Sequence, residues 1–129
     1  MRRKESLYPE DWLKIGDKEL TRAENLLRLK DLTGAGFNLH QAMEKYLKGF
    51  LLSQGWELRR VHELEVLLNE AIVYEPSFEQ FRDICFFITD FYTGDRYPFI
   101  NSYEPNFADI QSALKKAKQM ILLIKKLMK

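Results

Sequence analysis

The chain has 129 residues and a mass of 15.4 kDa, with 46% hydrophobic and 30% charged side chains. This length and balance fit one globular domain over residues 1–129 and argue against disorder. The sequence has no run of about 18 uncharged apolar residues, and no apolar signal core follows its first residues. We therefore expect a cytoplasmic protein that does not contact membranes.

The formal net charge of +1 hides a segregation along the chain. Residues 1–60 carry 12 basic and 9 acidic side chains, residues 61–110 carry 2 and 10, and residues 111–129 carry 6 and 0. One interpretation is a basic helix that packs beside an acidic one within the fold. The other is a surface that binds a polyanion or a protein partner.

Apolar side chains recur at helical spacing through most of the chain. The pattern predicts helices at residues 9–31, 37–53, 64–72, 78–92 and 106–126. Pro9 has the form of a helix first turn, residues 33–36 contain two glycines that favour a turn, and Gly55 suits a helix end. The prediction is an all-α fold, an up-and-down four-helix bundle with one additional short helix.

The periodicity fails over residues 94–105, which hold two prolines, and we predict a loop there. A loop of about a dozen residues usually has a functional role. Arg96 is one of only two basic residues between positions 61 and 110, and it has aromatic neighbours such as Tyr97. Arginine can bind a phosphate with two hydrogen bonds while aromatic rings stack on a base. The alternative is that Arg96 pairs with a nearby carboxylate and the rings cover the end of the bundle.

The remaining reactive side chains favour structural roles. His40 lies one residue from an apolar stripe, and His62 stands at the start of a predicted helix, where a boundary or capping role is expected. Cys85 lies on an apolar face and is expected to behave as a small hydrophobic side chain. No glycine-rich phosphate loop or spacing of metal ligands is present, so we expect no metal and no cofactor.

Three segments, in order, resemble the HEPN domain family. The segment 38–51, Asn-Leu-His-Gln-Ala-Met-Glu-Lys-Tyr-Leu-Lys-Gly-Phe-Leu, is similar to the family's second-helix signature. The segment 60–64, Arg-Val-His-Glu-Leu, followed by Leu67 and Leu68, resembles a second family motif. Tyr92 with Arg96-Tyr97-Pro98 resembles the run that precedes the family's last helix. The resemblance covers nearly the whole chain.

The resemblance implies a homodimer, found in prokaryotes beside a minimal nucleotidyltransferase in toxin–antitoxin pairs. Many members of the family are metal-independent ribonucleases, in which an arginine is followed by four to six residues and a histidine. Arg96 fits the arginine position, but positions 101–103 are Asn, Ser and Tyr. An asparagine amide cannot accept and return a proton near neutral pH, although Asn101 could orient a phosphate.

We therefore assign no catalytic residue. We predict a nucleotide or phosphate site formed by Arg96, Tyr97, Asn101 and His40. The favoured function is the nucleotide- or RNA-binding partner of a minimal nucleotidyltransferase, with poor or no cleavage of RNA by the isolated protein. Two alternatives stay open: a metal-independent ribonuclease toxin with an altered arginine–histidine motif, and a helical interaction module without a ligand.

Overall fold

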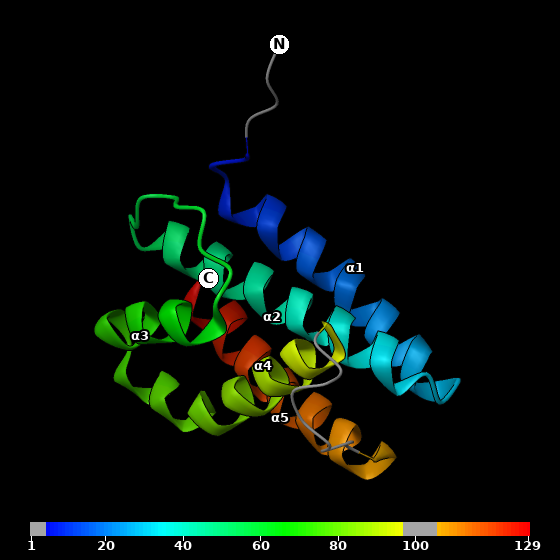
Figure 1. Ribbon diagram of the computed structural model, residues 1–129. Helices are drawn as coiled ribbons and strands as arrows, with labels where there is room; N and C mark the ends of the chain where they lie inside the picture. The colour runs from blue at the N-terminus through cyan, green and yellow to red at the C-terminus, as the bar shows by residue number, and fades with distance from the viewer. Residues whose placement is uncertain (1–4, 97–105) are drawn as a thin grey trace.

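The computed structural model describes residues 5–96 and 106–129, and these residues form helices and connecting segments with no strand (Figure 1). In chain order the elements are α1 (Pro9–Arg28), α2 (Leu32–Ser53), α3 (Leu64–Tyr74), the 3₁₀ helix η1 (Pro76–Phe81), α4 (Arg82–Arg96) and α5 (Phe107–Leu127). The four long helices pack together and the shorter α3 joins them beside α2. The predicted all-α fold is confirmed.

The junction of α1 and α2 differs from its prediction. The two glycines at positions 34 and 36 were expected to form the turn, yet both lie inside the first turns of α2. The chain instead turns at Lys30, whose φ is 65°, and Asp31 caps α2 by accepting a hydrogen bond from the Gly34 backbone N–H at 2.9 Å. A helix tolerates glycine in its first turn when a side-chain cap satisfies the free N–H groups there.

Helices α1 and α2 lie side by side at close range (Figure 1). A Cβ atom built on Gly16 of α1 would lie 3.0 Å from the ring of Tyr46, and one built on Gly49 of α2 would lie 3.0 Å from Leu13. Both are tighter than ordinary van der Waals contact. The absence of a side chain at these two positions therefore allows the helices to pack closely, and it presses the Tyr46 ring against the α1 backbone.

Helix α2 is the centre of the core. Its apolar side chains face α1 on one side and α3, α4 and α5 on others, and Tyr46, Leu47 and Leu51 are fully buried. The ring of Phe50 packs against that of Phe78 of η1, with the centroids 4.9 Å apart and the ring planes tilted by 47°. Burial of large apolar and aromatic side chains is the main stabilising contribution in a domain of this size. A helix buried on so many sides can hold polar groups only where partners satisfy them.

Helix α4 spans Arg82–Arg96, whereas the sequence predicted a helix over residues 78–92. Pro76 was expected to separate two helices, and it does so by starting η1, which leads directly into α4. Helix α4 was expected to stop before Gly94, but it continues through Arg96. A single glycine costs only about 1 kcal/mol inside a helix, less than the hydrogen bonds of one further turn can offset. Residues 94–96, which were predicted to lie in the loop, therefore belong to α4, and the rest of the predicted loop lies outside the described residues.

Helix α5 closes the bundle against α1 and α2. Asn106 and Asp109 form a reciprocal capping box at its start, which confirms the predicted beginning of this helix. Lys125 donates to Asp17 of α1 at 3.2 Å, and the same carboxylate oxygen accepts the hydroxyl hydrogen of Tyr46. Lys118 forms an ion pair with Glu24, also on α1. Part of the positive charge of residues 111–129 is therefore balanced by α1.

Candidate functional site

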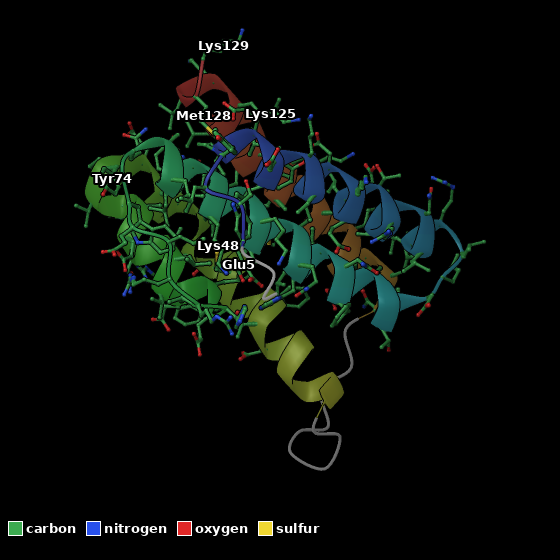
Figure 2. The ribbon with its side chains drawn as sticks, turned by 90° about the horizontal axis from the view of Figure 1, so that it is seen from above. Glu5, Lys48, Tyr74, Lys125, Met128 and Lys129 are labelled. Carbon is green, nitrogen blue, oxygen red and sulfur yellow. The ribbon has the colours of Figure 1, made fainter. Side chains whose placement is uncertain are left out.

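The predicted phosphate site falls mostly outside the described residues. Arg96 is the last residue of α4, whose final turns extend beyond the neighbouring helices (Figure 2). Tyr97 and Asn101 belong to residues 97–105, which lie outside the described part of the chain. In the sequence that segment lies between the end of α4 and the capped start of α5.

His40, the fourth predicted site residue, lies in the interior of α2 and is 3% exposed. Burial lowers the pKa of His40, because removing an imidazolium from water disfavours the charged form, and the nearby Glu44 charge opposes that effect. The imidazole is therefore held mainly in its neutral form near pH 7. This environment matches the structural role that the sequence favoured for a histidine beside an apolar stripe.

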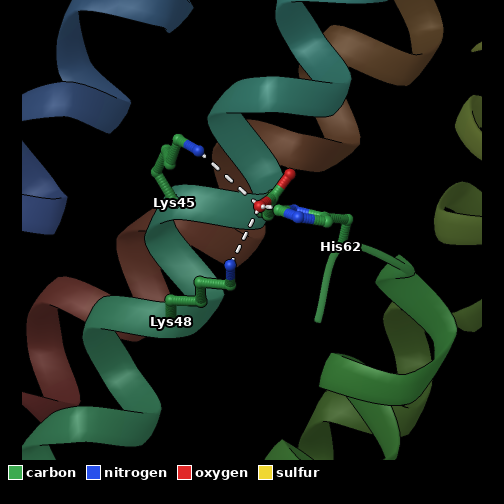
Figure 3. Close-up of polar contacts among 4 residues, drawn as sticks. Lys45, Lys48 and His62 are labelled. Atoms are coloured by element: carbon green, nitrogen blue, oxygen red, sulfur yellow. Dashed lines mark hydrogen bonds and ion pairs between the residues drawn. The ribbon is translucent and has the colours of Figure 1, made fainter. Parts of the chain in front are cut away.

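A cluster of charged side chains occupies α2 one turn beyond His40. Three cationic or titratable groups meet at a single oxygen, Oε2 of Glu44: the Lys48 Nζ atom at 3.1 Å, the Lys45 Nζ atom at 3.6 Å and His62 Nδ1 at 2.8 Å (Figure 3). The side chains of Glu44 and Lys48 are each only 2% exposed, whereas Lys45 is 19% exposed and His62 is 69% exposed. The cluster therefore runs from the interior to the surface.

Glu44 remains ionised in this setting. Burial is the largest single influence and acts to raise its pKa, but the hydrogen bond from His62 and the charges of Lys45 and Lys48 together outweigh burial, so the pKa of Glu44 lies below its usual value. A buried carboxylate is tolerated only when it is paired and hydrogen-bonded in this way. One negative charge thus faces two ammonium groups.

The two lysines also lie over the indole ring of Trp12. The Nζ atoms of Lys48 and Lys45 are 5.3 and 5.7 Å from the ring centroid, within the range of a cation–π interaction. Trp12 is held in turn by a hydrogen bond from its Nε1 atom to the Ser6 carbonyl oxygen at 2.9 Å. The N-terminal part of α1 therefore supports the cationic side of the cluster.

His62 does not have the capping role that the sequence predicted. Glu63 is the residue that precedes α3, and no side chain caps that helix. The His62 side chain turns instead toward α2 and binds Glu44, 18 positions earlier in the chain. The segment between α2 and α3, residues 54–63, is the connector, and His62 fastens its end to the middle of α2. A bond to a buried carboxylate is stronger than a cap on an exposed helix end.

Glu44, Lys45 and Lys48 lie within the segment 38–51 and were not predicted to form a site. The sequence does contain a sign of this cluster. Glu44 and Lys48 are four residues apart, and they interrupt the apolar series Met43, Leu47 and Leu51 of the helix. Charged residues are almost never fully buried unless they are paired. A pair at this spacing inside a core helix therefore predicts a buried ion pair, although its partner His62 cannot be found from spacing.

Other reactive groups give little sign of chemistry. Burial raises the pKa of the Cys85 thiol to about 12, so the side chain behaves as the small hydrophobic group that the sequence predicted. Among residues 5–96 and 106–129, no three His, Cys, Asp or Glu side chains gather as metal ligands would. Within the same residues, no helix has both the length and the apolar character needed to cross a membrane.

Comparison with known proteins identifies the family. The model of the HEPN domain family matches residues 9–127, so this chain belongs to the HEPN domain family. A crystal structure of an archaeal HEPN homologue superposes with a TM-score of 0.74 and 24% identity over 95% of this chain and 98% of the other. That likeness supports the fold. No curated protein matches the sequence.

Proposed function

We propose that this HEPN protein binds a nucleotide or an RNA phosphate near Arg96 and acts as the partner of a minimal nucleotidyltransferase in a toxin–antitoxin pair. The observation that carries the proposal is that Arg96 is the last residue of α4, immediately before Tyr97 and five positions before Asn101 in the sequence. Ligand-binding groups are often found where a loop leaves a rigid element. Membership of the family supports the same reading.

The chemistry at this end favours binding over cleavage. Arginine offers several N–H donors in a planar fork that matches a phosphate, and an aromatic neighbour can stack on a base. No histidine stands at positions 101–103, so the pattern that pairs an arginine with a histidine is incomplete there. His40, the remaining residue of the predicted site, is buried in α2.

Binding is tested with two probes, ATP and a single-stranded RNA oligonucleotide carrying a fluorescent label. Arg96→Ala should weaken binding at least about tenfold, because a charge-assisted contact contributes about 1.5–3 kcal/mol. Arg22→Ala is the matched control, since Arg22 is an exposed arginine on α1. Unchanged binding by Arg96→Ala with folded protein would remove this site from consideration.

A homodimer is part of the proposal. Among the residues whose side chains are described, α2, α4 and α5 expose the large apolar side chains Phe37, Phe86 and Leu122. Exposed apolar groups of this size are common at the interfaces of oligomers, and two-fold pairs are the commonest assemblies. Light scattering should give twice 15.4 kDa at micromolar concentration, and a species of 15.4 kDa would contradict the dimer.

Co-expression tests whether a minimal nucleotidyltransferase binds this protein. A minimal nucleotidyltransferase encoded beside this gene should co-purify with the tagged HEPN protein at a fixed ratio. If no such gene adjoins it, or if the two proteins elute separately, the partner role fails while binding at Arg96 remains open to its own test.

A further inference from the structure

Helix α3 carries apolar side chains on two opposite sides. Its inner side packs against α2, η1 and α4 through four fully buried residues, Leu64, Leu67, Leu68 and Ala71. On its outer side Val66 and Val73 are 39% and 80% exposed, and they lie about two helical turns apart. A helix that is apolar on all sides normally lies in the interior of a protein. Helix α3 lies instead at the edge of this molecule (Figure 1), so its outer side is suited to a partner.

The outer side of α3 has the pattern of a coiled-coil seam, which we call the α3 seam and define by Val66, Asn69 and Val73. The two valines occupy equivalent positions of a seven-residue repeat, and Glu65 and Glu70 occupy the positions that flank the seam. In two-stranded coiled coils, β-branched side chains suit the position that the valines hold, and the flanking charges determine which partner pairs. The seam therefore fits a second helix that lies along α3.

The surroundings of the α3 seam are acidic. Residues 63–83 contain six acidic side chains and one basic side chain, Arg82. Arg82 pairs with Glu79 at 2.6 Å and lies 4.0 Å from Glu65, and Arg59 of the connector pairs with Glu70. Among the residues that the structure describes, no cation pairs with Glu63, Glu75 or Asp83. Two cations thus serve six carboxylates, and the net charge of this face is negative.

The basic helix α5 does not neutralise this face. Lys118 and Lys125 form ion pairs with acidic side chains of α1, and Lys116 lies over the ring of Phe81, 5.5 Å from its centroid. The segregation of charge along the sequence therefore persists on the surface. An acidic surface repels nucleic acids and anionic lipids and attracts a cationic protein. Two copies of the α3 seam would bring acid against acid, which disfavours pairing of α3 with itself.

We propose that the α3 seam, with Glu65 and Glu70 at its flanks, is a docking site for a basic amphipathic helix of another protein. The partner helix carries apolar side chains at spacings of three and four residues and Lys or Arg at the positions that flank them. Apolar contact with the valines supplies affinity, and the ion pairs select the partner and its orientation. The proposal goes beyond the proposed function, because neither Arg96 nor a nucleotide takes part in it.

The test uses the full chain and two fluorescently labelled synthetic peptides. Both carry leucine at the seam positions and are stapled into a helix, because short isolated helices are marginal in water. One peptide carries lysine at the flanking positions, and the other carries glutamate there. Fluorescence anisotropy measures binding. The lysine peptide should bind at least about tenfold more tightly than the glutamate peptide, and this preference should shrink as salt is added.

Variants of the protein locate the contact. Val73→Ser and Leu29→Ser each remove a mostly exposed apolar side chain, but only Val73 belongs to the α3 seam. Val73→Ser should weaken binding of the lysine peptide about tenfold, whereas Leu29→Ser should leave it unchanged. The double variant Glu65→Gln with Glu70→Gln should weaken binding and reduce its salt dependence. Glu10→Gln, which changes an exposed acid of α1, is the control for charge and should alter neither property.

Three results would overturn the proposal: no binding of the lysine peptide, equal binding of the two peptides, or unchanged binding by Val73→Ser. A fourth would be light scattering in which Val73→Ser converts a dimer into a monomer, because the α3 seam would then be an interface between copies of this chain. Binding of ATP and RNA is measured separately on Arg96→Ala. Failure of the docking site and failure of the proposed function are therefore distinguishable.

Discussion

Helix α2 holds two polar clusters on different sides, and they differ in how completely their groups are paired. On the side of α1 and α5, the Tyr46 hydroxyl and the Lys125 ammonium both bind the Asp17 carboxylate. On the side of the connector, the Glu44 carboxylate binds two lysines and a histidine. The first cluster pairs one acid with one cation and one neutral hydroxyl, whereas the second has more cations than acids.

The two clusters differ in burial as well as in pairing. In the first cluster, burial and then the bond to Asp17 raise the pKa of Tyr46, so the phenol stays neutral and serves as a fixed donor. In the second cluster, the buried part, Glu44 with Lys48, stabilises the fold, and the exposed part, His62, extends to solvent. Four measurements would break or sharpen this contrast.

The largest effect is expected at the buried acid. Glu44→Gln keeps the shape of the side chain but leaves the Lys48 ammonium without a counter-charge, which should lower the free energy of unfolding by about 3–5 kcal/mol. Urea denaturation measures the loss. The double variant Glu44→Gln with Lys48→Met should recover most of it. A single variant as stable as the unmodified protein would show that Trp12 alone satisfies Lys48.

A smaller effect is expected in the paired cluster. Tyr46→Phe removes one hydrogen bond to a carboxylate and leaves Asp17 paired with Lys125, so we expect a loss of about 1–2 kcal/mol. The carboxylate is partly exposed and can turn to water, which limits the cost. Thermal unfolding measures it. A loss as large as that of Glu44→Gln would erase the distinction between the two clusters.

The free energy of unfolding should also fall in two separate pH ranges as the solution is acidified. The pKa of His40 is lowered in the folded state from its usual 6.5, so the unfolded chain binds a proton first and stability is lost as pH falls below 6.5. The pKa of Glu44 is lowered from 4.5, so its contribution is present above 4.5 and is lost as pH falls through its folded value. One proton changes stability by at most about 1.4 kcal/mol per pH unit.

His40→Gln separates these two windows. This variant should lose the slope just below pH 6.5 and keep the fall below 4.5, and unfolding measured at pH 7, 6, 5 and 4 shows both. A variant with the same slope as the unmodified protein between pH 6.5 and 5 would place the proton uptake on another group.

The smallest effect is expected at the surface of the second cluster. His62→Gln should change the free energy of unfolding by about 0.5 kcal/mol or less, because the side chain is mostly exposed and Glu44 keeps both lysines. Calorimetry on the unmodified protein and this variant measures the difference. A loss above about 2 kcal/mol would show that the bond from His62 to Glu44 stabilises the fold.

The sequence was enough for the number and order of the helices, because apolar periodicity and caps are local. Pro9, Gly55 and Asn106 mark ends that the structure confirms. The glycines at 34 and 36 misled the prediction, since the effect of a glycine depends on whether a cap such as Asp31 precedes it. Gly94 misled it in the same way, because an isolated glycine was treated as a helix end.

The cluster at Glu44 could be predicted only in part. A charged pair four residues apart within an apolar helix is visible in the sequence, and it indicates a buried ion pair. The third member is not visible, because the path of the connector decides which of its side chains reaches α2. His62 looked like a residue at a helix boundary until that path was known. The contact between His62 and Glu44 joins segments that are distant in the sequence, and local sequence patterns do not predict such contacts.

The position of Trp12 gives the protein an optical reporter of its own. Its indole lies under both lysines of the Glu44 cluster, and the chain has one other tryptophan, Trp56, near Arg59. Replacing Trp56 with phenylalanine would leave Trp12 as the single tryptophan, and the wavelength of its fluorescence emission responds to nearby charge. An anion that approaches Lys45, or a proton gained by Glu44, would change the electric field across that ring, so events at the cluster could be followed in real time without an attached dye.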